Sequence, residues 1–459
     1  MAKIALPTTE QRLQAGKSLR DKCSRASHGK VVLGQGDKRD VVALIQDSNE
    51  GRLENLVPIR HGRMLQSAFA YFRGTAAVQA YDLARTPVSR INVQACGDCH
   101  LMNFGGFATP ERTLAFDIND FDETLSAPFE WDIKRLAASF VVAARWRGFR
   151  AREARDAAVE AVSSYRESMR KRAEGSVLEA WYSSITVDDI VAAAGKDAEI
   201  LGRIKKRISE ATKATSEHVF QKITAPRKGL PHIIDQPPLL YHRREINDRV
   251  LATFFKHYRE TLPEERRVLF DHYRAVDVAL KVVGVGSVGT RCYVVLLLAA
   301  PDDALLLQVK EARRSVLQPY TRQRVRHNGE RVVIGQRLMQ SASDIFLGWS
   351  RGPNGRDFYV RQLRDMKVSP EVESMKPRIL RMYARLCGMA LARAHDKAGD
   401  AARIAGYLGG SDKFDEAIGD YAVAYADQVE RDYESFVKAV QSGRLKSDLS
   451  RSQLESALR

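Results

Sequence analysis

The spacing of hydrophobic residues divides the chain into helical and strand-like segments. Apolar residues recur at three- and four-residue steps over 158–169 and again over 375–440, as one buried face of a helix requires. Shorter runs rich in β-branched residues predict strands. These runs cover residues 113–118, 279–299, 305–312, 331–340 and 357–363. The pattern therefore predicts an α+β protein in which most strands lie in one stretch of the sequence.

The same pattern indicates how the chain is organised. A Pro- and Gly-bearing segment, PRKGLPHIIDQPP (226–238), interrupts the periodic segments and is the candidate boundary between regions. We expect five parts. They are an N-terminal extension (1–60), a helical part with polar loops (61–225), a linker and helix (226–270), a β-rich part (271–365) and C-terminal helices (366–459).

Acidic and amide side chains gather on two loops of the 61–225 part. Asp98, His100 and Asn103 follow one strand-like run, and Asp120 ends the next. Phosphoryl transfer uses such a set, because one carboxylate orients the acceptor hydroxyl while an Asn and a second Asp hold Mg²⁺ against nucleotide phosphates. Oxygen ligands of this kind suit Mg²⁺. A solvated loop with a capping Asp is the simpler alternative, since acids and Gly are ordinary loop residues.

Three strings in this part resemble those of aminoglycoside phosphotransferases and related small-molecule kinases. GDCHLMN (97–103) is similar to their catalytic loop, NDFD (119–122) to their metal motif, and PFEWDI (128–133) to a later Pro-x-x-Asp element. From residue 10 to residue 440 the chain also resembles the uncharacterised bacterial domain-of-unknown-function 2252 family. The stretches that carry this wider resemblance include VPIRHGRML, FAYFRG, CGDCHLMNFG, NDFDET, FEWDIKRLAAS, GQRLMQ and DIFLGW.

The kinase resemblance implies roles for individual residues. Asp98 and His100 become the candidate catalytic residues, with Asp98 as the base. Asn103 and Asp120 become the Mg²⁺ ligands, and Asp132 a buried anchor for the catalytic loop. Asp117 is the second choice for the metal position given to Asp120.

A glycine-rich loop and a lysine lie far downstream of these residues. The string GVGSVG contains Gly284, Gly286, Ser287 and Gly289, and an apolar, β-branched run follows it. A dinucleotide site of the G-x-G-x-x-G type requires a helix there, so a strand–loop–strand hairpin that covers phosphates is favoured. Lys310 ends a later strand, where a kinase has the lysine that pairs with the α- and β-phosphates. An ordinary glycine-rich hairpin with an exposed lysine is the alternative.

Two features of this arrangement depart from an ordinary kinase. The helix Glu that orients such a lysine is not identifiable, because neither Glu311 nor Glu330 has the expected spacing. The glycine loop and lysine also follow the catalytic loop, whereas in a kinase they precede it. The resemblance therefore implies a two-lobe, protein-kinase-like fold that is circularly permuted. In this reading the 378–395 helix corresponds to the segment that normally leads into the catalytic loop.

Other motifs compete with the kinase interpretation. CGDCH (96–100) matches the C-x-x-C-H pattern of c-type haem attachment, a redox dithiol or part of a zinc site. No secretory signal is visible, and the remaining cysteines show no paired spacing, so we disfavour all three. Arg73 either clamps a phosphate or pairs with an internal acid such as Asp132.

Charge and composition limit the remaining classes. The chain of 459 residues has a net charge of +16, which favours phosphate-rich partners. The basic run RIKKR (203–207) lacks the interleaved aromatic residues that stack bases, so nucleic acid is not the favoured ligand. No apolar run is long enough to span a membrane, and five cysteines fit reduced thiols in a cytoplasmic protein.

The sequence thus predicts a phosphotransferase that uses ATP and Mg²⁺ and acts on a hydroxyl acceptor of unknown identity. Two alternatives stay open. In the first, a protein of the same fold holds the nucleotide in the reverse orientation and transfers AMP. In the second, the protein is a catalytically silent module that binds nucleotide or nucleic acid.

Overall fold

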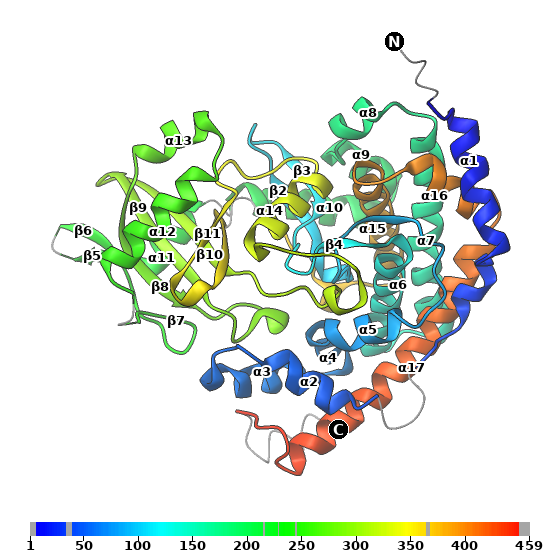
Figure 1. Cartoon of the computed structure of the whole chain (residues 1–459), viewed down its shortest axis with the longest axis horizontal. Coiled ribbons are helices and arrows are strands. Elements are labelled where there is room, and N and C mark those ends of the chain that lie inside the picture. Colours follow the sequence, from blue (N-terminus) through cyan, green and yellow to red (C-terminus); the bar gives the residue numbers. More distant parts are fainter. Residues whose placement is uncertain are drawn as a thin grey trace.

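The computed structural model describes residues 6–33, 39–213, 216–227, 229–243, 246–363 and 368–448. Helices dominate the right of Figure 1, and a sheet with its own helices occupies the left. We call residues 216–363 the β-rich region and the remainder the helical region. The structure confirms an α+β architecture.

A six-stranded antiparallel sheet forms the centre of the β-rich region, in the order β11–β12–β10–β9–β8–β7. Its strands are β7 (Leu240–Tyr241), β8 (Arg274–Lys281), β9 (Cys292–Ala300), β10 (Asp303–Glu311), β11 (Gly348–Arg351) and β12 (Asp357–Gln362). All but β7 lie within the stretch 271–365 that the sequence marks as β-rich.

Both faces of this sheet are covered, which explains why β9 is a continuous apolar run. Val295 and Leu297 pack with α12 (Asp248–Glu260) and α13 (Glu264–Asp271), whereas Val294 and Leu296 pack with α11 (Ser216–Ile223) and the hairpin of β5 (Thr224–Arg227) and β6 (Leu230–Ile233). Successive side chains of a strand point to opposite faces, so a strand buried on both faces has no polar alternation.

The helical region packs around α6 (Phe129–Trp146), whose residues are buried from Phe129 to Ala144. Around it lie the helix that follows it in the sequence and three helices from the C-terminal part of the chain. These are α7 (Ala151–Ala173), α15 (Pro377–Lys397), α16 (Ala401–Leu408) and α17 (Lys413–Gln441). Gly388 of α15 allows a close crossing with α7, since a Cβ there would lie 2.2 Å from the carbonyl oxygen of Ala161.

Shorter elements complete the helical region. The helices are α1 (Thr9–Ser18), α2 (Val41–Asn49), α3 (Val57–Met64), α4 (Ala68–Gly74), α5 (Ala76–Leu83), α8 (Val177–Tyr182), α9 (Val187–Ala194) and α10 (Ala198–Lys213). The strands are β1 (Asn92–Ala95), which pairs with β4 (Leu125–Pro128), and β2 (Phe104–Ala108), which pairs with β3 (Leu114–Ile118). The helix α1 packs on α16 along the right edge of Figure 1.

One predicted element is wrong. Of residues 331–340, expected as a strand, 331–339 belong to the helix α14 (Asn328–Met339), which lies between β10 and β11 in the sequence, and Gln340 caps its end. The helix begins with a cap, because the side chain of His327 accepts a hydrogen bond from the Glu330 amide. The strands at 113–118, 305–312 and 357–363 and the helices over 158–169 and 375–440 are confirmed. Within the described part of the chain, no helix has the length and apolar composition needed to cross a membrane.

Candidate functional site

A cavity of about 930 Å³ lies where the β-rich region faces the helical region. Its wall comes from segments that are distant in the sequence, and these include the loop after β1, the turn after β3, the loop between β8 and β9, and the end of β10. Most of the candidate residues named from the sequence line it. They are Asp98, His100, Asn103, Asp120, Gly284, Gly286, Ser287 and Lys310.

The loop after β1 is held by the buried carboxylate of Asp132, at the start of α6. This carboxylate accepts hydrogen bonds from the amides of Cys96 (2.6 Å) and Gly97 (2.9 Å). The oxygen bonded to the Cys96 amide, Oδ2, also lies 3.2 Å from Nε2 of His395. Gly97 has a positive φ of 86°, and a Cβ there would lie 2.3 Å from the carbonyl oxygen of Glu123. A glycine at this position therefore lets the loop pass close to the turn after β3.

Asp98 presents its carboxylate at the cavity wall. One oxygen, Oδ1, contacts the guanidinium of Arg135 at 2.7 Å, and the other, Oδ2, lies 3.8 Å from Nε2 of His100. Arg135 is itself fixed by Gln79 and by the carbonyl oxygen of Phe72. Burial lowers the pKa of His100 to about 4, so its imidazole is neutral at physiological pH. Asp98 is thus a fixed carboxylate with one edge toward the cavity.

Asn103 and Asp120 lie beside Asp98 and are joined through the backbone. The Asn103 side-chain amide donates to the Asp98 carbonyl oxygen at 2.6 Å, which leaves the Asn103 amide oxygen as the atom suited to ligate a cation. The backbone amide of Asn119 donates to the Asn103 carbonyl oxygen at 2.7 Å, and this bond fixes the residue before Asp120. An amide oxygen and a carboxylate are ligands that suit Mg²⁺.

Asp117 does not line the cavity. It is fully buried on β3, and its carboxylate accepts hydrogen bonds from Arg393 (2.9 Å) and from the amide of Ser341 (2.8 Å). A carboxylate held in this buried ion pair serves packing between β3 and α15. Of the two acids proposed for the second metal position, Asp120 is the one that faces the cavity.

The glycine-rich loop joins β8 to β9, so the expected strand–loop–strand hairpin is confirmed. The segment from α2 to α3 supports it: Arg63 donates to the Val283 carbonyl oxygen, and the Leu53 amide donates to the Gly289 carbonyl oxygen at 2.7 Å. Gly284, Gly286 and Ser287 line the cavity, whereas Gly289 lies behind them against Arg52. The loop therefore presents backbone to the cavity along its first half.

Lys310 is buried at the end of β10 and forms an ion pair with Asp122. Burial acts to lower the pKa of Lys310, but the carboxylates of Asp120 and Asp122 hold it well above its usual range. The two acids considered as its partner from the sequence lie elsewhere. Glu311 pairs with Arg291 and Arg356, and Glu330 is exposed on α14.

A family model described as an uncharacterised protein conserved in bacteria (DUF2252) matches residues 52–439. The chain belongs to the DUF2252 family. No curated protein and no solved structure matches it. The loops after β1 and β3, the β8–β9 loop and β10 all lie within the DUF2252 match.

Among the cavity residues of this DUF2252 protein that the sequence did not predict are three with side chains suited to contact a ligand. Asp122 pairs with Lys310 and accepts a hydrogen bond from Tyr359 at 2.8 Å. Arg361 of β12 and Gln336 of α14 also line the wall. Asp122 lies two residues after Asp120 in the acidic stretch NDFD, and this position could have identified it from the sequence. Gln336 was missed because residues 331–340 were predicted to form a strand.

Arg73, at the end of α4, lines the cavity. Its Nε is buried without a hydrogen-bond partner, and burial lowers its pKa. The partners recorded for Asp132 are the two loop amides and His395. Arg73 is placed for either role: it lines the cavity, where an anionic ligand would meet it, and the charges of Asp98 and Glu373 raise its pKa against the effect of burial.

The two cysteines of the C-x-x-C-H string are buried. Burial raises the pKa of the Cys99 thiol well above its usual range, which disfavours the thiolate that metal binding and disulfide exchange require. No cysteine belongs to a group of three metal-ligating side chains among the described residues. Asp98 and His100 of this motif therefore line the cavity, whereas Cys96 and Cys99 belong to the core.

Proposed function

We propose that the protein is a phosphotransferase that uses ATP and Mg²⁺ and acts on a hydroxyl group. One observation carries the proposal: the acidic loop set of Asp98, Asn103 and Asp120 lines the same cavity as Lys310 and the glycine-rich loop. Nearly two hundred residues of chain separate the two sets in the sequence. Their chemistry is complementary, because phosphoryl transfer needs cations around the phosphates and a carboxylate near the acceptor.

Each residue has a role that fits its contacts. The free edge of Asp98 accepts a hydrogen bond from the acceptor hydroxyl and orients it, while Arg135 keeps the carboxylate in place. Asn103 and Asp120 hold Mg²⁺, which supplies charge neutralisation for the nucleotide phosphates. Lys310 and the backbone amides of Gly284 and Gly286 bind phosphate oxygens.

The order of elements in the β-rich region supports a kinase-like arrangement. A glycine-rich loop joins two antiparallel strands, the next strand carries Lys310, and α14 follows, as in the nucleotide lobe of a kinase. On this basis we assign a two-lobe kinase-like fold.

Circular permutation explains why the catalytic loop comes first in the chain. The end of α15 lies beside the strand that leads into the catalytic loop, since the Gln94 amide donates to the Ala398 carbonyl oxygen at 3.3 Å. A Cβ on Gly399 would lie 2.8 Å from the side chain of Val93. A short connection from α15 to β1 would restore the order of an ordinary kinase, and new termini are tolerated where chain ends lie close together.

The partner of Lys310 keeps a second function open. A kinase pairs this lysine with a Glu of the following helix, but here Lys310 pairs with Asp122 of the turn after β3. This difference favours two other functions. The protein would either hold ATP in another orientation and transfer AMP, or bind nucleotide without turnover. Nucleic acid is less well supported, because Arg203 and Arg207 of the basic run bond to Ser374 and Glu371.

The test measures transfer and binding separately. The protein is incubated with ATP, Mg²⁺ and a mixture of hydroxyl compounds, and mass spectrometry distinguishes an added phosphoryl group from an added AMP. We expect phosphoryl transfer in the wild type. Asp98→Asn should lower turnover by about 10²–10⁴-fold with ATP affinity kept within a few-fold, because Asp98 contacts the acceptor and not the nucleotide. Asp120→Asn should lower both turnover and ATP affinity, because Asp120 is a proposed ligand of the Mg²⁺ that binds the nucleotide phosphates.

The matched control is Asp427→Asn, which changes a half-exposed acid that pairs with Arg145 outside the cavity. Turnover that is unchanged in both Asp98→Asn and Asp120→Asn would contradict the proposal. An AMP adduct that depends on Asp120 would favour the second function instead.

A further inference from the structure

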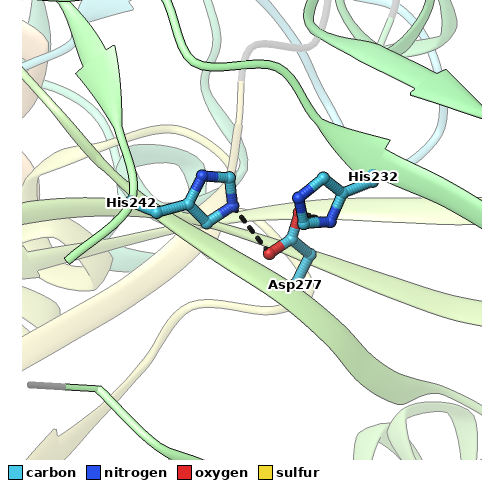
Figure 2. A group of neighbouring side chains, drawn as sticks. All are labelled: His232, His242 and Asp277. Carbon is cyan, nitrogen blue, oxygen red and sulfur yellow. Dashed lines mark hydrogen bonds and ion pairs between the residues drawn. The ribbon is translucent and has the colours of Figure 1, made fainter. Parts of the chain in front are cut away.

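A second cluster of chemically active side chains lies at the edge of the β-rich region, away from the cavity. His232 lies on β6, His242 follows β7, and Asp277 lies on β8. Figure 2 shows both imidazole rings directed at the carboxylate of Asp277. Three separate segments of chain therefore bring two nitrogen donors and one carboxylate to the same point.

The contacts within the cluster are short and specific. Nδ1 of His232 lies 2.7 Å from one carboxylate oxygen of Asp277, and Nε2 of His242 lies 2.9 Å from the other. The two rings are parallel within 6°, with centroids 4.8 Å apart. Asp277 is only 8% exposed, while each imidazole keeps about a third of its side-chain surface accessible. A cation that reaches the cluster thus meets a buried carboxylate between two accessible donors.

The backbone fixes the carboxylate at this point. The register of β8 against β9 shifts between Ala275 and Asp277, and a bulge of this kind re-aims a side chain. The amide of Ile233 donates to Asp277 at 2.7 Å, which ties the end of β6 to β8. The carboxylate is therefore placed before any ligand arrives.

We propose that His232, His242 and Asp277 form a binding site for a divalent transition-metal ion of the Zn²⁺ class. The ligating atoms lie within 4.8 Å of one another. Two imidazoles and one carboxylate suit Zn²⁺, whereas Mg²⁺ prefers an all-oxygen set. The three protein ligands leave a fourth position for water.

Asp235 supports this assignment from behind His242. Its carboxylate lies 2.7 Å from Nδ1 of His242, the ring nitrogen that faces away from Asp277. Metal-ligating histidines usually donate their second ring N–H to such a carboxylate, which orients the ring and raises its basicity. The same arrangement is present here between Asp235, His242 and the proposed metal position.

The position of the site indicates what the metal does. Its ligands come from β6, from the residue after β7 and from β8, so a bound ion joins the β5–β6 hairpin to the β7–β8 edge of the main sheet. The site does not line the cavity and does not depend on the proposed phosphotransferase function. A bound ion would stabilise the β-rich region by mass action, because it binds only the folded arrangement.

Isothermal titration of the untagged full chain with ZnCl₂ tests the proposal. We expect one wild-type site per chain, with His232→Ala and Asp277→Asn each at least about tenfold weaker. Asp235→Asn should bind about 10–100-fold more weakly although all three ligands remain. His272→Ala is the matched control, since this exposed histidine lies outside the cluster and should leave affinity unchanged. In the same titration with MgCl₂, the wild type and His232→Ala should not differ.

Two results would overturn the proposal. One is a wild-type chain that takes up no Zn²⁺ at micromolar concentrations, in which case the cluster is a hydrogen-bonded clasp. The other is equal Zn²⁺ affinity in the wild type, His232→Ala and Asp235→Asn. Asp235→Asn and His232→Ala change partly exposed side chains, so the test does not depend on the folding of Asp277→Asn.

Discussion

Asp132→Asn is the substitution that tests most sharply how the catalytic loop is held. The Asp132 carboxylate is buried and accepts hydrogen bonds from two consecutive amides, those of Cys96 and Gly97, and it also faces His395. Asparagine has nearly the same shape but only one acceptor oxygen. Its NH₂ group would face an N–H of the loop or of His395, so at least one buried donor loses its partner.

The magnitude follows from the number of bonds. A buried donor without a partner costs about 1–3 kcal/mol, and the remaining bond loses its charge assistance. We expect the loop to be less stable by about 2–4 kcal/mol, which corresponds to a factor of about 30 to 900 in a local opening equilibrium. Because Asp98 directly follows Gly97, turnover should fall as well.

Hydrogen exchange read residue by residue is the appropriate assay. The amides of Cys96 and Gly97 should exchange faster in Asp132→Asn by the factor above, while amides of the β8–β10 sheet keep their protection. Asp427→Asn is the control, because an exposed ion pair contributes at most about 1 kcal/mol. Exchange at Cys96 and Gly97 within threefold of the wild type would refute the anchoring role of Asp132.

Two further predictions concern the stability of the whole chain. His61 has a pKa lowered to about 4 by burial, so the unfolded state binds more protons below pH 6.5, and stability should fall as the pH drops from 6.5 towards 4. His61→Gln should remove about 3 kcal/mol of this acid sensitivity, as measured by urea unfolding at pH 7 and pH 4. Gly388→Ala should destabilise the protein by about 1–3 kcal/mol through a clash with Ala161, whereas Gly202→Ala, in open space on α10, should be neutral or stabilising. Equal melting temperatures for the two glycine variants, or a pH dependence unchanged by His61→Gln, would contradict these expectations.

The sequence predicted the residues of the site better than their pairings. Asp98, Asn103 and Asp120 lie on two short loops only about twenty residues apart, so their type and spacing were enough to predict that they lie together. The partner of Lys310 could not be predicted from the sequence, because Asp122 contacts Lys310 only where the β-rich region packs against the helical region. Asp117 has the same chemical type as Asp120, and only burial beside Arg393 separates the two.

The error at residues 331–340 has a similar cause. The local run of Val and Ile favours a strand, yet the segment is helical because its packing overrides this weak preference. Gly335 lies against Thr124, where a Cβ would come within 2.3 Å, and Arg331 donates to the carbonyl oxygens of Asp122 and Thr124. These contacts join α14 to the turn after β3, which no local pattern reveals.

Calorimetric titration of the wild type and Lys310→Met with ATP, with and without Mg²⁺, tests the central claim most directly. Methionine replaces the buried lysine with a side chain of similar length and no charge. We predict Mg²⁺-dependent ATP binding by the wild type and at least tenfold weaker binding by Lys310→Met. ATP binding that is absent up to millimolar concentrations, or that is equal in the two proteins, would contradict the assignment of this cavity as a nucleotide site.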